Sequence, residues 1–585
     1  MTDKQPIDPA QWLAEFGRAG QEMMRPFLAA AAAAVPPAAA APGAAPAGGN
    51  GAAPDSYAQV AAMTQKLAEL QQGYWQQMAN TWTAMATGAL AAAAPPAADR
   101  RFAAPAWHED PRFDLLQRSY LAYSQFLQKS VDSAKVDDKT RGQLSFAVRQ
   151  FVDAMSPANF LATNPEALQL ALETGGTSIT EGMGLLLKDL AKGRISITDE
   201  SAFEVGRNIA VTEGDVVFEN DLMQLIQYAP RTPQVHRRPL VMIPPCINKF
   251  YILDLTPENS FVRYAVDQGH TVFMVSWRNI TADLGHLTWD DYLRLAVITA
   301  IDVAQEITGA AEVDTLGFCI GGTLLASALA VMKTNGDERV ASVTLLTSML
   351  DFSDAGEIGM LVTEQSVAQR ESAIGKGGVV EGSELALTFS ALRANDLIWP
   401  YVVNSYLKGK GPAAFDLLYW NSDGTNLPGP MFCWYLRNTY HENRLREPGG
   451  TVQCGVPVDL SDIDVPGFIY ASREDHIVPW RTAYASTQLL GGHNTFVLGA
   501  SGHIAGVVNP PAKNKRNYWT GGTAGGDAEH WFSTAESKPG SWWPVWSAWL
   551  DSRAGGKVAA PAKPGSRKHR RIEPAPGRYV KAKAE

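Results

Sequence analysis

A cysteine between two glycines stands in the stretch VDTLGFCIGG, residues 313 to 322. Gly317, Cys319 and Gly321 fit the pattern in which a nucleophile occupies a sharp turn between a strand and a helix, where neighbouring side chains would not fit. A strand-like run precedes this turn, and an alanine- and leucine-rich helical run follows it. The amino end of that helix would lower the pKa of the thiol. We therefore predict Cys319 as a nucleophile; an inert buried cysteine, the alternative, would not need both glycines.

Two later stretches supply an acid and a base in the chain order that such a turn requires. GFIYASREDHIVPW ends an apolar run at Asp475, and NTFVLGASGHIAG ends another in a small-residue loop at His503. We predict Asp475 as the acid and His503 as the base. His476 is the rival base, and Glu474 is the rival acid.

The residue after the nucleophile and an early loop predict where an oxyanion would be bound. The backbone N–H of Ile320 is one expected donor. The loop PPCINKF follows an early apolar strand, and Pro244 and Pro245 have no N–H group. The first available donor in that loop is therefore the main chain of Cys246.

The choice of cysteine rather than serine indicates the kind of acyl donor. Attack of a thiolate on a thioester exchanges one thioester for another and is close to neutral in free energy, whereas the resulting acyl-enzyme can pass its acyl group to a hydroxyl with a net gain. This chemistry points to acyl transfer from a thioester, with coenzyme A as the carrier. No phosphate-binding loop, dinucleotide fingerprint or metal-ligand motif stands in the sequence, so we expect no bound cofactor and no metal.

Composition narrows the class of protein. The chain has 585 residues, 46% of them hydrophobic and 19% charged, as in a globular protein of more than one structural unit. A formal net charge of -10 argues against nucleic-acid binding. Its 4 cysteines are far apart and form no CxxC pair, which favours a reducing cytoplasm. No secretion signal and no apolar spanning run are expected.

Strand-like and helical runs alternate over residues 196–552. Such alternation predicts βαβ units and a mostly parallel sheet. The alternation lapses over about residues 351–465, a segment rich in tryptophan and tyrosine, and then resumes. Together with the turn at Cys319, this pattern predicts an α/β fold, the α/β-hydrolase fold with a cap insertion.

The first third of the chain and its end differ from this core. We expect a short amphipathic helix over residues 1–27, an Ala/Pro/Gly-rich linker over 28–54 and a mainly helical domain over 55–195. Methionine and aromatic residues recur every three or four positions in these helices, which indicates either helix-to-helix core or a surface for a partner. Residues 553–585 are basic and Pro-rich and are expected to be a flexible tail.

Several long motifs resemble one family. The polyhydroxyalkanoate synthases have similar stretches to six in this chain: PPCINKFYILDL, GHTVFMVSWRN, GFCIGG, YWNSDGTNLPGPMFCWYLRNTY, SREDHIVPW and GASGHIAGVVNPP. The chain length and GFCIGG are similar to the class I, short-chain type of this family. The resemblance implies polymerisation of (R)-3-hydroxyacyl-CoA, with 3-hydroxybutyryl-CoA the expected substrate and CoA the leaving group. It implies Cys319 as the acylated nucleophile, His503 as its base and Asp475 as the third member, which either orients His503 or helps to activate the 3-hydroxyl.

The resemblance also implies partners and a location. These are a homodimeric active form, a cap that gates access to Cys319, and attachment in the cytoplasm to the growing polymer granule, with contacts to granule-associated proteins. Two other functions stay open from the residues alone. One is a thiol-dependent thioesterase of the same fold, and the other is a granule-coating structural protein without activity.

Overall fold

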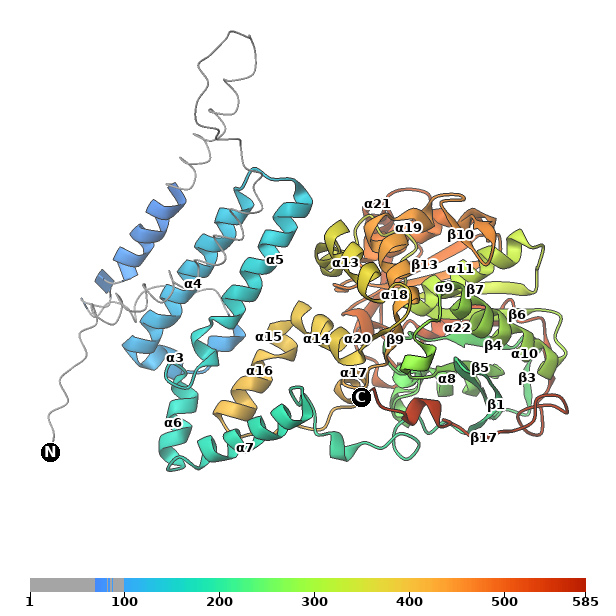
Figure 1. Cartoon of the computed structure of the whole chain (residues 1–585), viewed down its shortest axis with the longest axis horizontal. Coiled ribbons are helices and arrows are strands. Elements are labelled where there is room, and N and C mark those ends of the chain that lie inside the picture. The colour runs from blue at the N-terminus through green and yellow to red at the C-terminus, as the bar shows by residue number, and fades with distance from the viewer. Residues whose placement is uncertain (1–68, 82, 85–86, 88–98, 585) are drawn as a thin grey trace, which may run out of the picture. The chain divides into compact units, whose positions relative to one another are not determined.

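The computed structural model describes residues 69–81, 83–84, 87 and 99–584 (Figure 1). The predicted helix of residues 1–27, the predicted linker of 28–54 and the start of the predicted helical domain lie outside the described residues.

Helices make up the first part of the described chain. Residues 69–81 are helical. The α-helices described between residues 99 and 192 are α3 (Ala106–Glu109), α4 (Pro111–Asp132), α5 (Asp138–Ala154), α6 (Pro165–Glu173) and α7 (Thr177–Lys192). Aspartate side chains cap the amino ends of α4 and α5. Asp110 accepts a hydrogen bond from the backbone N–H of Arg112, and Asp137 accepts one from the backbone N–H of Thr140. Phe102 and Trp107 form a small buried core beside α4, so part of the aromatic pattern is helix-to-helix packing.

An 11-stranded sheet forms the centre of the chain after residue 213, in the order β15-β14-β13-β12-β7-β6-β4-β5-β2-β1-β17. The strands from β13 to β5 in this order are parallel to their neighbours, and the outer strands are antiparallel. Their bounds are β1 (Gly214–Glu219), β2 (Met223–Tyr228), β4 (Leu240–Ile243), β5 (Val272–Trp277), β6 (Val313–Phe318), β7 (Val340–Leu346), β12 (Gly467–Ser472), β13 (Asn494–Gly499), β14 (Asn517–Thr520), β15 (Glu536–Pro539) and β17 (Glu573–Pro574).

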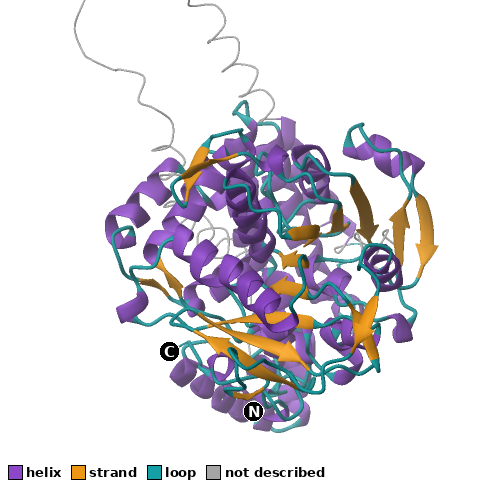
Figure 2. Ribbon diagram, turned by 90° about the vertical axis from the view of Figure 1, so that its right-hand side faces the viewer, coloured by secondary structure: helices purple, strands orange, loops and turns teal. Residues whose placement is uncertain are grey.

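Both faces of this sheet are covered, and Figure 2 shows the strands running between helices. In β4, Val241 and Ile243 pack into one buried cluster, while Leu240 and Met242 pack into the other. This alternation is the period of two that places successive side chains on opposite faces. The first cluster includes residues of α10 (Thr299–Thr308), α11 (Ile320–Thr334) and α19 (Trp480–Leu489), and the second includes residues of α8 (Phe261–Asp267) and α22 (Trp543–Asp551).

Between β7 and β12 the chain leaves the sheet, and we call residues 351–465 the cap. Its helices are short and are joined by two small antiparallel sheets, β8–β9 and β10–β11. Three of its helices contribute to the site: α14 (Gly382–Leu392), α15 (Ala394–Leu397) and α17 (Asp416–Asn421). The other elements are α12 (Gly356–Leu361), α13 (Glu364–Ile374), α16 (Trp399–Tyr401), α18 (Gly429–Tyr435), β8 (Val379–Val380), β9 (Leu427–Pro428), β10 (Thr451–Gln453) and β11 (Val456–Val458).

The end of the chain differs from the predicted flexible tail. Strand β16 (Lys557–Ala559) pairs with β3 (Gln234–His236), and β17 pairs with β1 at the edge of the main sheet. The basic side chains find carboxylates on the core, with Arg571 2.7 Å from Asp215 and Lys568 2.6 Å from Glu306. Edge pairing and these ion pairs order a segment that its composition alone predicted to be solvated.

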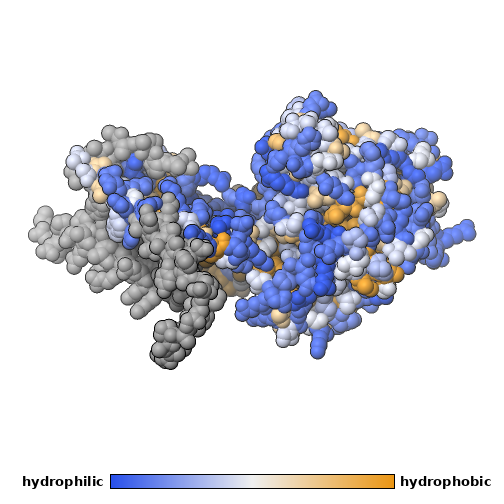
Figure 3. Space-filling model, turned by 90° about the horizontal axis from the view of Figure 1, so that it is seen from above, coloured by the Kyte–Doolittle hydropathy of each residue, from blue (hydrophilic) through white to orange (hydrophobic). Residues whose placement is uncertain are grey.

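The surface drawn in Figure 3 is mostly hydrophilic over the described residues, with small hydrophobic patches. Among the helices that the structure describes, none combines the length and apolar character needed to cross a membrane.

Candidate active site

Cys319 lies on the turn between β6 and α11 with a backbone conformation of φ 54° and ψ -129°. Residues other than glycine rarely adopt a positive φ, and holding one there costs about 1–3 kcal/mol. The flanking glycines allow the chain to pack tightly around it. A Cβ on Gly321 would lie 2.3 Å from the carbonyl oxygen of Ile243, and one on Gly317 would lie 2.4 Å from Cα of Gly322. The structure therefore has the strained turn that the motif predicts, and it presents the thiol at the carboxyl edge of the sheet.

His503 and Asp475 lie together at the same edge. Strands β12 and β13 are adjacent and parallel, with Ser472 opposite Gly499, so the loops that follow both strands meet. Nδ1 of His503 lies 2.6 Å from Oδ2 of Asp475, and both side chains are buried. The other carboxylate oxygen, Oδ1, accepts hydrogen bonds from the backbone N–H groups of Ile477 and Val478, each at 2.9 Å. These bonds fix the carboxylate and use both of its oxygens.

The electrostatics of His503 suit a group that takes the proton of the Cys319 thiol and then holds it. Burial alone would lower its pKa, but the Asp475 carboxylate and the Cys319 sulfur outweigh burial and raise the pKa to about 10. The Cys319 sulfur is thus close enough to the His503 imidazole to stabilise its protonated form. The ring of Phe318 stacks on that of His503 with centroids 5.7 Å apart. The thiol, the imidazole and the carboxylate thus form one connected chain of groups.

His476, the rival base, has the opposite character. Burial is the main reason why its pKa falls to about 4, so its imidazole is neutral near pH 7. Its Nδ1 is buried without a hydrogen-bond partner in the described chain, so no acid orients the ring. Glu474, the rival acid, is exposed. The geometry favours His503 and Asp475 over both rivals.

The two expected oxyanion donors come from neighbouring strands. β4 pairs with β6, with Ile243 opposite Gly317, so the loop after β4 lies beside the turn of Cys319. Within the described residues, the backbone N–H groups of Cys246 and Ile320 donate to no backbone acceptor. The Cys246 thiol is fully buried, and burial raises its pKa far above the usual range. Burial therefore disfavours the reactive thiolate of Cys246, while its main-chain N–H has no backbone acceptor among the described residues.

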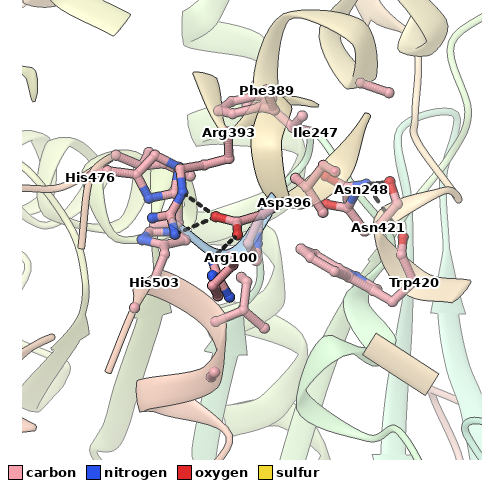
Figure 4. A pocket seen from close by; sticks show the side chains of 18 residues that line it. Arg100, Ile247, Asn248, Phe389, Arg393, Asp396, Trp420, Asn421, His476 and His503 are labelled. Atoms are coloured by element: carbon pink, nitrogen blue, oxygen red, sulfur yellow. Dashed lines mark hydrogen bonds and ion pairs between the residues drawn. The ribbon is translucent and has the colours of Figure 1, made fainter. Parts of the chain in front are cut away.

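A cavity of about 420 Å³ opens onto Cys319 and His503 (Figure 4). The core loops and the cap both line it, and the cap contributes Phe389, Arg393 and Trp420 among others. A cavity of this size, mostly apolar with a few polar groups, is typical of a small-molecule site.

Three charged residues of the cavity form an ion-pair group that sequence reasoning missed. Asp396 lies 2.8 Å from Arg100 and 2.6 Å from Arg393, and Figure 4 shows these side chains beside His476 and His503. Arg100 comes from the helical region and the other two come from the cap, with Arg100 and Asp396 separated by 296 in the sequence. Single charges at such separation carry no motif, so no local signal in the sequence could have identified the group.

Comparison with known proteins identifies the family. A family profile described as the N-terminus of poly-beta-hydroxybutyrate polymerase (PhaC) matches residues 98–265, and one described as the alpha/beta hydrolase fold matches residues 239–510. The poly(3-hydroxyalkanoate) polymerase subunit PhaC of Cupriavidus necator is 52% identical over 99% of this chain and 96% of its own. This chain belongs to the poly(3-hydroxyalkanoate) polymerase family.

Other members of the polymerase family are also similar to most of this chain. The poly(3-hydroxyalkanoate) polymerase of Methylorubrum extorquens is 45% identical over 84% of this chain and 82% of its own, and the subunit PhaC of Rhizobium meliloti is 44% identical over 83% and 80%. Among solved structures, a monoacylglycerol lipase of Paleococcus ferrophilus aligns with 48% of this chain and 90% of its own at 13% identity and a TM-score of 0.32. The alpha/beta hydrolase profile over residues 239–510 confirms the expected fold, and the PhaC profile and relatives confirm the expected family.

Proposed function

We propose that this chain polymerises (R)-3-hydroxyacyl units from their CoA thioesters and carries the growing polyester as a thioester on Cys319. Membership of the poly(3-hydroxyalkanoate) polymerase family makes it an acyltransferase that uses hydroxyacyl-CoA. The observation that supports the role of Cys319 is its place on the strained turn at the cavity, in contact with His503, which in turn is held by Asp475 at 2.6 Å.

The loading step follows from this arrangement. His503 takes the proton of the Cys319 thiol, and the thiolate attacks the carbonyl carbon of the substrate thioester. The N–H groups of Cys246 and Ile320 stabilise the resulting oxyanion. The intermediate then expels the CoA sulfur, which takes the proton from the His503 imidazolium. One carbon–sulfur bond forms and one breaks, so the acyl group moves to Cys319 and free CoA leaves.

Chain extension uses the same base. The 3-hydroxyl of another acyl unit gives its proton to His503 and attacks the acyl carbon on Cys319, so an ester bond forms and the Cys319 thiolate is released. Both oxygens of Asp475 already accept hydrogen bonds, from His503 on one side and from two backbone N–H groups on the other. This occupancy supports a role for Asp475 in orienting His503 rather than in contacting the hydroxyl.

A short acyl unit is the proposed substrate, with 3-hydroxybutyryl-CoA the first to test. The proposal rests on the likeness to the Cupriavidus necator chain and on the cap, which supplies much of the cavity wall and would limit what reaches Cys319.

We also propose a homodimer in the cytoplasm, attached to the polymer granule and to granule-associated proteins. On α7, the exposed residues Ile179, Met183, Leu187 and Leu190 follow each other at helical spacing and have exposed fractions of 38%, 51%, 59% and 67%. An apolar helix face of this kind is suited to an apolar surface or a partner.

One assay tests the proposed function against the thioesterase alternative. The chain is incubated with (R)-3-hydroxybutyryl-CoA, and CoA release is measured together with polymer and free 3-hydroxybutyrate. Polymer that accounts for the released CoA supports the proposal. Free 3-hydroxybutyrate in equal amount to CoA, with no polymer, would make the chain a thioesterase instead.

A further inference from the structure

A cluster of two histidines and an aspartate lies apart from the cavity, where the end of helix α22 meets the start of the sheet. Oδ1 of Asp551 lies 3.2 Å from Nε2 of His236 and 3.2 Å from Nε2 of His270. The two imidazoles stack, with centroids 4.5 Å apart and planes inclined by 19°. One ligand atom from each residue lies within 4.8 Å of the other two.

The ring nitrogens of this cluster are buried and lack hydrogen bonds. Nε2 of His236 and both ring nitrogens of His270 have no hydrogen-bond partner among the described residues. Both Nε2 atoms lie 3.2 Å from Oδ1 of Asp551, so the two imidazoles converge on one carboxylate oxygen. Buried polar atoms are nearly always satisfied in proteins, which makes three unsatisfied nitrogens in one place unusual.

The three residues of the cluster come from β3, from the turn before β5 and from the end of α22. The His236 side chain is 6% exposed and that of His270 is fully buried, whereas that of Asp551 is 42% exposed. His236 stands at the end of β3, and its backbone N–H bonds to the carbonyl of Gly269 at 2.8 Å. The backbone of Gln268 makes a hydrogen bond with the His236 imidazole. Because Nε2 of this ring has no partner, we assign the bond to Nδ1. A backbone carbonyl on the far nitrogen is the usual support of a metal-binding histidine.

We propose that His236, His270 and Asp551 bind one divalent transition-metal ion, with Zn²⁺ the best match. Two imidazoles and a carboxylate are a common ligand set for zinc. Ligand atoms about 2.1 Å from one tetrahedral ion lie about 3.4 Å from each other, close to the separations of Asp551 Oδ1 from the two nitrogens. The exposed side of Asp551 leaves a fourth position open to water.

The bound ion would join the end of the chain to the core. Asp551 ends α22, and β16 follows it and pairs with β3 so that Lys557 lies opposite His236. A metal ion shared by α22, β3 and the turn before β5 would hold this segment in place. This role is separate from the acyl chemistry and does not depend on it.

The experiment uses the full chain carrying Cys319→Ala, because a free catalytic thiol would itself bind zinc. After chelation, Zn²⁺ binding is titrated by calorimetry, and Co²⁺ is added as a spectroscopic probe of four-coordinate geometry. The test variant adds Asp551→Asn, which changes a partly exposed side chain and should fold. The matched control adds His569→Gln, which breaks a 2.5 Å contact between another histidine and a carboxylate, Glu306, outside the cluster.

The proposal predicts one Zn²⁺ site, visible Co²⁺ absorption bands and a melting temperature that rises with Zn²⁺. Asp551→Asn should weaken binding at least about tenfold, since loss of even a supporting residue costs that much, and the control should bind normally. Equal affinity in the test and control variants, or no Zn²⁺ bound at all, would overturn it. If a further variant, His270→Gln, does not fold, Asp551→Asn alone decides the question.

Discussion

Nδ1 of His503 lies 2.6 Å from Oδ2 of Asp475, and both groups are buried at the carboxyl edge of the sheet. A buried ion-pair partner makes an imidazole a stronger base and fixes which of its nitrogens faces the substrate. Here the bond on Nδ1 leaves Nε2 free to take the proton of Cys319. The predictions below follow from this contact and from the turn that holds the thiol.

Asp475→Asn should keep the fold and remove most of the activity. The amide has nearly the same shape, but it cannot stabilise the His503 imidazolium and it favours the wrong tautomer. In hydrolases with an equivalent triad the same change lowers kcat by about 10⁴-fold, and we expect a loss of about 10²–10⁴-fold in CoA release. The matched control is Glu474→Gln, which alters the exposed neighbour and should leave the rate within about twofold. Similar losses in both variants would contradict the assignment.

Replacing His503 should lower the rate of CoA release far more than replacing His476. His503→Gln removes the base and should lower the rate of CoA release by about 10²–10⁴-fold. His476→Gln removes a weakly basic imidazole, because burial lowers its pKa to about 4, and should cost less than about tenfold in the rate of CoA release. Rates measured at pH 7 with saturating substrate decide between them. If His476→Gln is the more damaging change, His476 is the base after all.

Stability should depend on pH through His503. The folded-state pKa is about 10 and the unfolded value about 6.5, so the folded protein holds the proton more tightly. This contribution is fully present below about pH 6.5 and is lost as the pH rises towards 10. The difference in unfolding free energy between wild type and His503→Gln should therefore shrink over that range, as urea unfolding at several pH values would show. A difference that stays constant between pH 6.5 and pH 10 would mean that the folded protein does not hold this proton more tightly than the unfolded chain.

Gly321→Ala should damage the turn although it adds only one methyl group. That group would lie 2.3 Å from the carbonyl oxygen of Ile243, and main chain cannot move aside easily. We expect a loss of about 1–3 kcal/mol in the free energy of unfolding, together with most of the activity. Gly309→Ser, at a position with open space around it, is the control for a glycine change of similar size, although its positive φ of 67° carries its own cost. Full activity in Gly321→Ala would show that the turn is not needed in this form.

The sequence predicted what depends on local pattern and chain order. The alternation of strand-like and helical runs predicted the sheet, and the glycines around Cys319 predicted the turn. Both patterns are properties of residues that are neighbours in the sequence. Asp475 and His503 could be chosen because each follows a strand of that sheet. The register of β12 with β13, which brings their two loops together, is visible only in the fold.

What the sequence could not predict depends on contacts between distant segments. The cavity group of Arg100, Arg393 and Asp396 joins the helical region to the cap through side chains that no motif marks. The tail from Arg553 was expected to be flexible because composition shows its charges but not the carboxylates that meet them, such as Glu306. Pairing at the sheet edge adds order that only the folded core provides.

The central claim is that the polyester is held as a thioester on Cys319, and trapping the acyl-enzyme tests it most directly. The protein is mixed with (R)-3-hydroxybutyryl-CoA, quenched in acid, digested and analysed by mass spectrometry. The account predicts 3-hydroxybutyryl or oligomer mass on the peptide that contains Cys319, removable by hydroxylamine, and neither label nor polymer in Cys319→Ala. Polymer formation by Cys319→Ala, or the acyl label on another residue, would contradict it.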